Sequence, residues 1–352
     1  MLLSFILYMN IFFNLLLIVV FPYLISNGTI SEGFLGYRSD WGVEYILLSN
    51  LLANGLIIPF VWWKAGFFKF QLEGTVIKPM WKYSIPLLFM GLAGVTNELL
   101  SRFLFEYVLP PNFYAGLTAR EAGGVFGANF KLAILMNLVI QAFKYAAEPF
   151  FFKQSADKNS PLLYAKVMHV FILFCTLLMI AISVNLEWMG PLFLRKPGYG
   201  EGLFIVPTLL MGYLLLGIYF NLSIWFKITD QTKYSFWITL VGAIISIAVI
   251  FIFVPILGYM GGALSTILCY FVMCLLCYLY GQKYYPIPYQ TAKGLFYLLV
   301  SFVISYLGFY LDLGEAVLNF FAKNSLIFLY LGLIFLLEKE HIKSYLPKSK
   351  KL

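Results

Sequence analysis

Apolar segments long enough to cross a membrane recur ten times in this sequence, and they restrict its fold more than any other feature. A bilayer hydrocarbon core is about 30 Å thick, which a helix of about 20 apolar residues spans. The predicted spans are residues 2–25, 43–63, 83–109, 124–151, 162–186, 203–226, 235–257, 259–281, 292–311 and 315–337. Because membrane-embedded backbone must satisfy its own hydrogen bonds, we expect an all-α, polytopic transmembrane helix bundle.

Composition agrees with a membrane protein, since 62% of the residues are hydrophobic and 11% are charged. Soluble domains have about 25% charged residues. The connections between spans are short, so we expect the activity to lie between the helices rather than in an extramembrane domain. A net charge of +8 in a soluble protein would suggest nucleic acid, but here the positive residues lie in short loops. We therefore expect no nucleic-acid partner.

Positive residues are distributed unequally between the two sets of alternate loops. One set, together with the C-terminal tail, holds sixteen: Lys64, Lys69, Lys78, Lys82, Lys153, Lys158, Lys166, Lys227, Lys233, Lys283, Lys293, Lys339, Lys343, Lys348, Lys350 and Lys351. The other set holds four, Arg38, Arg120, Arg195 and Lys196. Since cytoplasmic loops carry the excess of lysine and arginine, both termini are predicted to be cytoplasmic.

Metal and cofactor chemistry finds little support in the sequence. Cys274 and Cys277 form a C-x-x-C pair inside an apolar segment, without the second ligand pair that a metal site needs. His169 and His341 stand apart in the sequence, so neither belongs to a recognisable zinc or nucleophilic motif. We expect no metal, no cofactor and no catalytic residues, and hence a protein that is not an enzyme.

Ionisable residues inside the third and fourth spans indicate where the function lies. A charge at mid-bilayer costs roughly 2.5 to 3.5 kcal/mol on insertion scales, so such residues face protein or water. Glu98, Arg102 and Glu106 fall within about 80° of one another on the third span at about 100° per residue. They are predicted to form one stripe that faces a polar cavity.

A second polar stripe is predicted on the fourth span. Asn137, Gln141, Lys144 and Glu148 fall within about 60° of one another, whereas Lys131 lies about 100° or more from most of that stripe. Lys131 is expected to face a different neighbour. The alternative interpretation is structural: Glu98 with Arg102, and Lys144 with Glu148, are spaced to neutralise each other as i,i+4 pairs.

Several segments resemble one bacterial transporter family. The most specific is Gln141-Ala-Phe-Lys-Tyr-Ala-Ala-Glu-Pro-Phe-Phe-Phe152, preceded by Tyr83-Ser-Ile-Pro-Leu87 and followed by Asn221-Leu-Ser-Ile-Trp-Phe-Lys-Ile-Thr-Asp-Gln-Thr-Lys-Tyr234. Gly258-Tyr-Met-Gly-Gly-Ala263 and Gly281-Gln-Lys-Tyr-Tyr-Pro-Ile-Pro288 add to the similarity. Together they resemble the polysaccharide-biosynthesis flippases, which belong to the multidrug, oligosaccharidyl-lipid and polysaccharide exporter superfamily.

The resemblance implies a domain organisation with two helical lobes. Residues 1–63 would be a partial N-terminal lobe, 64–82 a cytoplasmic linker that is either interfacial or an ordinary basic loop, and 83–281 a complete six-helix lobe. Residues 282–337 would add two transmembrane helices, and 338–352 would form a basic cytoplasmic tail. Family members usually have more helices, so the resemblance implies that about four N-terminal transmembrane spans of roughly 20 residues each are lacking. It also implies that this chain by itself transports little.

The function implied by the resemblance is export of an oligosaccharide linked to undecaprenyl diphosphate, from the inner to the outer leaflet of the bacterial inner membrane. Such a cargo is anionic, so its carrier needs cations and hydrogen-bond donors in a shielded groove. The cation candidates are Arg102, Lys131 and Lys144, and the candidates for binding sugar hydroxyls are Asn97, Asn137 and Gln141. The acids Glu98, Glu106 and Glu148 would either balance these cations or exchange protons that drive transport. Membrane lipids, a polysaccharide polymerase and glycosyltransferases are the expected partners.

Two other functions are compatible with the same sequence. In a cation-coupled drug or metabolite extruder of the same superfamily, Glu98 and Glu148 would be the coupling acids. In a membrane sugar or acyl transferase or polymerase, an external loop or a His/Asp/Glu cluster near the interface would be expected. Position 101 is a serine where the family pattern favours an acid beside the arginine, so an acid–arginine pair does not transfer to Ser101 and Arg102.

Overall fold

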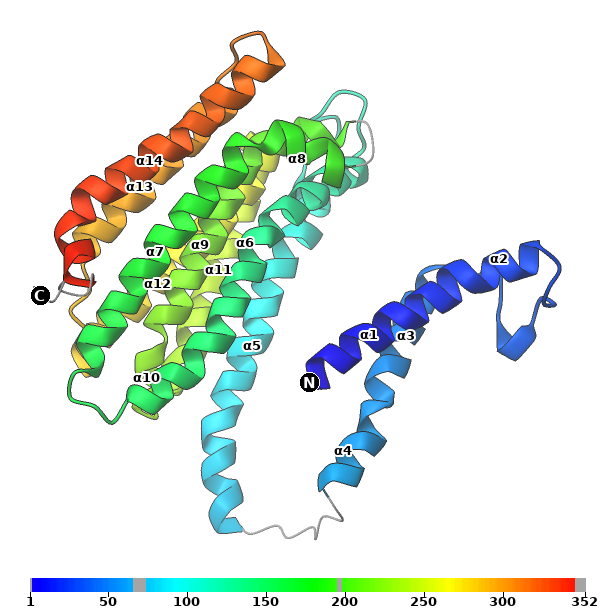
Figure 1. Cartoon of the computed structure of the whole chain (residues 1–352), viewed down its shortest axis with the longest axis horizontal. Helices are drawn as coiled ribbons and strands as arrows, with labels where there is room; N and C mark the ends of the chain where they lie inside the picture. The colour runs from blue at the N-terminus through cyan, green and yellow to red at the C-terminus, as the bar shows by residue number, and fades with distance from the viewer. Residues whose placement is uncertain (1, 66–73, 195–197, 346–352) are drawn as a thin grey trace, which may run out of the picture. The chain divides into compact units, whose positions relative to one another are not determined.

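The described parts of this chain consist of helices, turns and loops (Figure 1). The computed structural model describes residues 2–65, 74–194 and 198–345; within them, the side chains of residues 90, 92–98 and a few others are not described. These ranges contain no strand. The prediction of an all-α bundle is therefore confirmed.

Nine of the described segments are long and apolar enough to cross a membrane. They are Phe5–Ser26, Glu44–Trp63, Ala119–Gln154, Ser160–Val184, Tyr199–Ile228, Lys233–Leu257, Tyr259–Tyr284, Thr291–Tyr310 and Ala316–Lys339. Each overlaps one of the predicted spans. The remaining predicted span, 83–109, lies almost entirely within α5 (Gly74–Val108), a helix of 35 residues. The protein is thus a multi-pass membrane protein.

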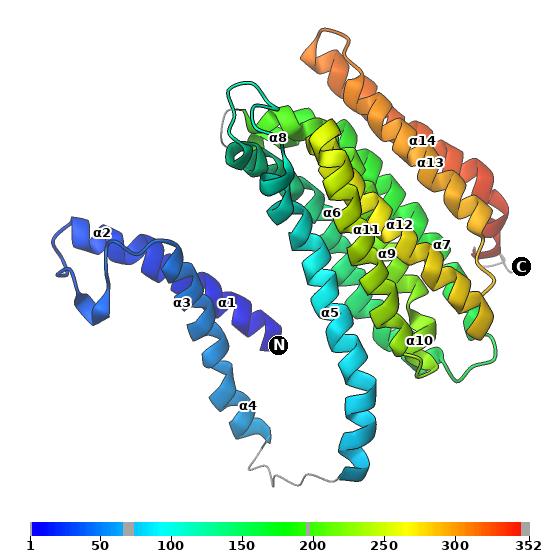
Figure 2. The same ribbon diagram turned by 180° about the vertical axis from the view of Figure 1, so that it is seen from behind.

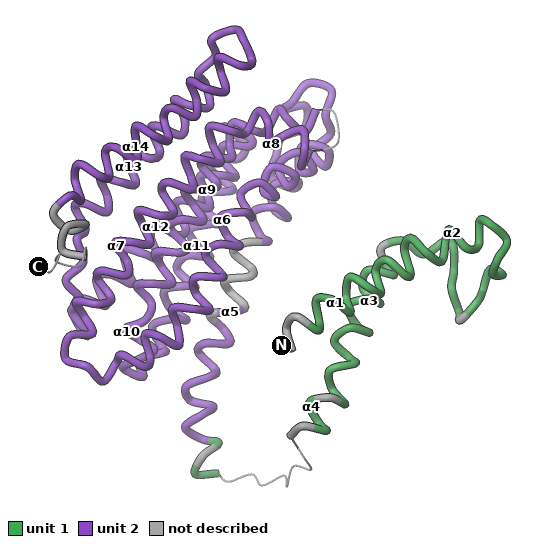
Figure 3. The backbone as a smooth tube through the Cα atoms, in the orientation of Figure 1, with its two compact units in different colours: residues 1–77 green, residues 78–352 purple. Residues whose placement is uncertain are grey.

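The helices divide into two compact units, residues 1–77 and 78–352 (Figure 3). Unit 1 contains α1 (Leu2–Leu15), a π-helical turn η1 (Leu16–Val20), α2 (Phe21–Ser26), a 3-10 turn η2 (Phe34–Gly36), α3 (Val43–Gly55) and α4 (Ile57–Ala65). Within unit 1, α1 packs against α3, and the Asn10 amide donates a hydrogen bond to Asn50 between them. Unit 1 therefore contains the two spans assigned by sequence to a partial lobe.

Two segments predicted to lie outside the membrane differ in extent from the expectation. In the predicted linker 64–82, residues 66–73 lie outside the described ranges, and 74–82 are the first turns of α5. The predicted tail begins at 338, but α14 continues to Tyr345. Residues 346–352 lie outside the described ranges.

Unit 2 holds the remaining helices, except that residues 74–77 at the start of α5 belong to unit 1. They are α5 (Gly74–Val108), α6 (Ala119–Gln154), α7 (Ser160–Val184), α8 (Leu186–Phe193), η3 (Tyr199–Ile205), α9 (Val206–Leu222), α10 (Ile224–Ile228), α11 (Lys233–Leu257), α12 (Tyr259–Tyr284), α13 (Thr291–Tyr310) and α14 (Ala316–Tyr345). The short helices α8 and α10 lie at opposite ends of unit 2 (Figure 1). We refer to these as the α8 end and the α10 end.

Helix α9 forms the centre of unit 2. It packs against α6, α7, α12 and α13, and the views from opposite sides show it enclosed by its neighbours (Figures 1 and 2). Every residue of α9 except Phe220 is buried. A helix that is apolar around its whole circumference is expected in such a central position.

Two glycines let α9 approach its neighbours closely. A Cβ atom on Gly217 would lie 2.4 Å from Cζ of Phe171 on α7, and one on Gly212 would lie 2.7 Å from Cγ2 of Thr266 on α12. Cβ contacts this short do not occur, so a larger residue at either position would force the helices apart. Small residues serve the same purpose at many transmembrane helix interfaces.

Candidate functional site

The polar stripe predicted on the fourth span lies on α6. This helix begins with a capping box, in which Thr118 and Glu121 bond to each other's backbone amides. Farther along, Nε2 of Gln141 donates a hydrogen bond to Oδ1 of Asn137 at 3.2 Å. Lys144 and Glu148 continue the row toward the α10 end, and all four side chains of the row are half-buried.

Glu148 forms an ion pair with Lys227, which lies on α10. The Lys227 side chain is 8% exposed and that of Glu148 is 33% exposed. The interpretation in which Lys144 and Glu148 simply neutralise each other is therefore incomplete, because the Glu148 carboxylate also forms an ion pair with the buried Lys227. Tyr83 of α5 lies within electrostatic range of Glu148, so α5 contributes to this end of the site.

Lys144 lies over an aromatic ring. Its Nζ is 4.4 Å from the centre of the Phe220 ring, which belongs to α9. The negative face of a ring attracts an ammonium group, and the attraction is stronger where water is excluded. Lys144, Lys227 and Glu148 form what we call the α6–α10 cluster. With two ammonium groups and one carboxylate, this cluster carries one net positive charge.

Arg102 occupies a second position between α5 and α6. Its Cζ lies 4.4 Å from the centre of the Phe130 ring, and Phe130 is 1% exposed. One turn further along α5, Phe105 stacks on Phe126 of α6 with ring centres 4.6 Å apart. Aromatic packing therefore joins α5 to α6 around the half-buried Arg102.

The structure does not bring Arg102 and Lys144 into one compact site. The Phe130 ring that contacts Arg102 and the Lys144 side chain both belong to α6, on nearly the same face. Their positions differ by 14 residues, or about 21 Å at 1.5 Å per residue. Lys144 therefore lies toward the α10 end and Arg102 toward the α8 end.

The other predicted site residues are distributed as follows. Lys131 is exposed and lies outside the polar row. Glu106 is half-buried beside α6, since a Cβ atom on Gly123 would lie 3.6 Å from the Glu106 Cβ. Asn97 and Glu98 are in the helical part of α5, but their side chains lie outside the described residues.

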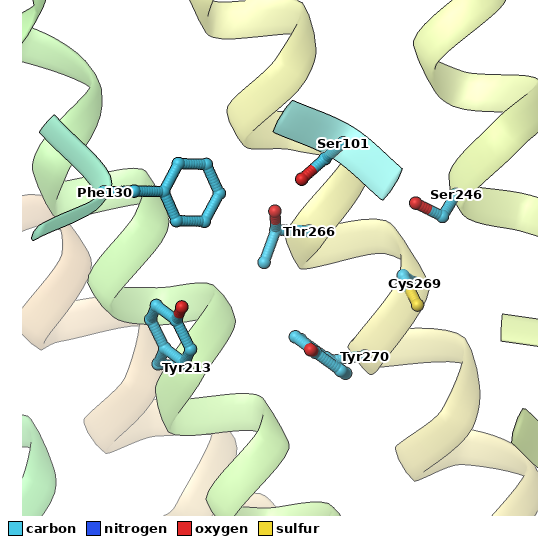
Figure 4. Close-up of a pocket in the computed structure, with 7 residues that line it drawn as sticks. All are labelled: Ser101, Phe130, Tyr213, Ser246, Thr266, Cys269 and Tyr270. Atoms are coloured by element: carbon cyan, nitrogen blue, oxygen red, sulfur yellow. The ribbon is translucent and has the colours of Figure 1, made fainter. Parts of the chain in front are cut away.

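A small cavity lined by hydroxyl groups lies next to the Phe130 ring that contacts Arg102. Its lining consists of Ser101, Phe130, Tyr213, Ser246, Thr266, Cys269 and Tyr270 (Figure 4). The volume is about 10 Å³, which is close to that of one water molecule. Figure 4 shows the hydroxyls of Ser101 and Thr266 directed toward each other. Ser101 therefore contributes a neutral hydroxyl to this cavity.

A larger, mostly apolar groove of about 590 Å³ lies between α7, α9, α12 and α13. Leucine, isoleucine, methionine and phenylalanine side chains line most of it, including Met211, Ile267 and Phe302. At the α10 end its lining becomes polar, with His169, Gln290 and Thr291. The groove thus has an apolar body and a polar end.

Lys227 is the site residue that sequence reasoning missed. It directly follows the predicted span 203–226, so by sequence it belongs with the loop lysines. The structure buries it because α10 is held against α12. There, Nε1 of Trp225 donates a hydrogen bond to the Cys277 carbonyl at 3.1 Å, and the Trp225 ring stacks on Tyr284. The sequence feature that could have indicated a buried Lys227 is Trp225, a large apolar side chain two residues before it.

Comparisons with known proteins give no match to this chain among family models, curated proteins or solved structures.

Proposed function

We propose that this protein moves an oligosaccharide linked to undecaprenyl diphosphate from the inner to the outer leaflet of a bacterial cell membrane, for synthesis of surface polysaccharide. The observation that carries this proposal is the net positive α6–α10 cluster beside the amides of Asn137 and Gln141. Excess positive charge inside a membrane bundle is costly and is usually retained for function. An anionic cargo explains its sign.

The groups of the site match the parts of this cargo. Lysine ammonium groups bind phosphate oxygens through charge-assisted hydrogen bonds, and amide side chains offer both donors and acceptors to sugar hydroxyls. The apolar groove suits part of the polyprenyl chain, since each buried CH₂ group contributes about 0.8 kcal/mol.

Transport by alternating access fits the two cationic positions. Under this proposal Lys144 receives the diphosphate at the α10 end, and Arg102 contacts the cargo about 21 Å farther along α6. Glu106, Glu148 and Glu98 balance the cations or exchange protons during the cycle. The excess of lysine in the loops at the α10 end supports a cytoplasmic location of that end, and we propose that both termini are cytoplasmic. A polysaccharide polymerase and glycosyltransferases would act on the same cargo.

Export of a cationic drug is a weaker proposal, because Lys144 and Arg102 would repel such a cargo. A metabolite extruder would have the same six-helix lobe. The amides of Asn137 and Gln141 beside the α6–α10 cluster are better suited to a sugar linked to phosphate. Among the described residues, no observation specifically favours a membrane transferase or polymerase.

The proposal can be tested in a bacterial strain that lacks its own flippase and makes the matching lipid-linked oligosaccharide. The protein should restore surface polysaccharide at the low level expected of this chain by itself, whereas Lys144→Ala should abolish that restoration and leave the lipid-linked precursor in the inner leaflet at a normal protein level. Lys153→Ala is the matched control, because Lys153 is an exposed lysine on the same helix. Equal restoration by both variants would contradict the proposal.

A further inference from the structure

The hairpin of α13 and α14 contacts the rest of unit 2 largely through α7, and the α7–α14 interface contains a series of polar contacts. At the α8 end, Lys323 pairs at 2.5 Å with Glu187, which lies in the first turn of α8. Asn324 exchanges hydrogen bonds with Asn185, the residue that follows the last turn of α7. Near the middle, the Tyr330 hydroxyl donates to Thr176. At the α10 end, Glu338 meets His169.

These four contacts follow one antiparallel register. The partner position falls from 187 to 185, 176 and 169 as the α14 position rises from 323 to 324, 330 and 338. Between transmembrane helices the hydrophobic effect offers little attraction, so polar contacts and close packing hold such pairs together. We call this series the α7–α14 seam.

The last contact of the seam is a cluster around one oxygen of the buried Glu338 carboxylate, with Lys293 at its exposed edge. Oε1 of Glu338 lies 3.1 Å from Nε2 of His169, and the Tyr297 hydroxyl donates to it at 2.8 Å. Nζ of Lys293 lies 3.4 Å from the same oxygen. The side chain of Glu338 is 4% exposed and that of His169 is 11% exposed. Helices α7, α13 and α14 therefore meet at a single acceptor.

We propose that His169 and Glu338 form a proton-binding site that holds the α10 end of α14 against α7. The ring nitrogen Nε2 already lies 3.1 Å from the carboxylate oxygen. A proton added to the ring forms an imidazolium, so the same contact becomes an ion pair, which is stronger in a site shielded from water. This inference does not depend on the cargo proposed above.

Within the described seam, this contact is the one that can change charge between pH 5 and 8. An unperturbed imidazole has a pKa of about 6.5, whereas lysine, tyrosine and cysteine lose their protons above about pH 8 and glutamate gains one near pH 4. Among the described residues, the titratable groups near His169 are Glu338 of α14 and Tyr297 and Lys293 of α13. Tyr330 of α14 lies near Tyr297, and Cys274, Tyr278 and Tyr289 line the same groove as His169. The proton is therefore expected on His169.

The site also borders the apolar groove, because His169 is part of the groove's polar end. Gly294 of α13 lines the same groove one residue beyond Lys293. A tighter seam at low pH would hold α13 and α14 against α7 and keep this end of the groove closed. Loss of the proton would let the hairpin separate from α7 there.

The test measures the distance across the seam as a function of pH. Spin labels are placed on Val170→Cys and Leu337→Cys in the purified full chain in lipid nanodiscs; both positions are exposed, and the four native cysteines are buried. The fraction of molecules in which the two labels are close together should fall at least about threefold between pH 5.5 and pH 8. Over this range most ordinary histidine side chains lose their added proton. A matched pair at the α8 end, on Trp188 and Phe321, should show no change.

Two further measurements decide the outcome. In His169→Gln the side chain keeps a neutral hydrogen-bond donor but cannot take up a proton, so the distance between the two spin labels should not depend on pH. The proposal would be overturned by a wild-type distance that does not change with pH, or by a His169→Gln distance that still does. Since the chain has 2 histidines, histidine-selective NMR of His341→Gln reports His169 directly. Its ring signal should titrate with the same midpoint as the distance, and a signal constant from pH 5 to pH 8 would refute the proton site even if the glutamine variant misfolded.

Discussion

Lys227 forms an ion pair with Glu148 across 79 residues of sequence, and this contact joins α10 to α6. Because the carboxylate of Glu148 is engaged by a buried lysine, Lys144 brings a positive charge to the cluster that the pair does not balance. Lys144 contacts the Phe220 ring, which neutralises no charge. The excess charge on α6 is therefore a consequence of how α10 folds back against α12.

The first prediction concerns the stability of this ion pair. Breaking a buried pair costs about 3–5 kcal/mol, but Glu148 is about one-third exposed and screened by water, so we expect Glu148→Gln or Lys227→Met to cost about 1–3 kcal/mol. The double variant should cost less than the sum of the two. Thermal unfolding of the purified variants in detergent measures this, and strictly additive effects would show that the two residues are not coupled.

The second prediction separates the two cationic positions. Arg102 of α5 contacts Phe130, which lies about 21 Å along α6 from Lys144. Arg102→Ala should therefore leave initial binding of the cargo within about twofold, yet reduce export at least about tenfold, a loss of about 1.4 kcal/mol or more. Lys144→Ala should reduce both. Binding and export are measured on the same preparations. An equal loss of binding in both variants would mean that the two cations act as one site.

The third prediction concerns the packing of α9. Gly217→Ala should destabilise unit 2 by about 1–3 kcal/mol, since the added methyl group would collide with the Phe171 ring. Gly332→Ala on α14 is the control, because nothing lies within 4 Å of the place that its added methyl group would occupy. Unfolding midpoints in detergent compare the two. Equal stability would indicate that α7 can move aside without loss.

The fourth prediction concerns orientation. Cysteines introduced in the loop 155–159 and near the C-terminus should react only with reagents that enter the cytoplasm, because lysine is concentrated in these segments. A cysteine introduced in the loop between α13 and α14, for example at Leu313, should react from outside; this residue is exposed. External labelling of the loop 155–159 would reverse the proposed direction of transport.

Periodicity and length predicted the features that depend on neighbouring residues. The predicted spans agree with the observed helices because a membrane helix needs one continuous apolar stretch. The amides of Gln141 and Asn137 meet because residues four apart face the same side of a helix.

Contacts between distant residues were not predictable in this way. Lys227 is buried because Trp225 anchors α10 on α12, and nothing in the local pattern distinguishes this lysine from a loop lysine. His169 seemed isolated in the sequence, yet α14 returns antiparallel to α7 and places Glu338 beside it. Likewise, Lys323 contacts Glu187 because α14 runs antiparallel to α7 and α8 follows α7 directly. Such partners depend on helix packing, which a single sequence does not specify.

The most direct test of the central claim measures binding of the charged part of the cargo. The purified chain in nanodiscs is titrated with undecaprenyl diphosphate and with the neutral alcohol undecaprenol, and binding is followed by native mass spectrometry. We predict that the diphosphate binds at least about tenfold more tightly, which corresponds to about 1.4 kcal/mol, and that Lys144→Ala removes this preference while Lys153→Ala keeps it. If Lys144→Ala retained the full preference for the diphosphate, the α6–α10 cluster would not be the site that recognises the cargo.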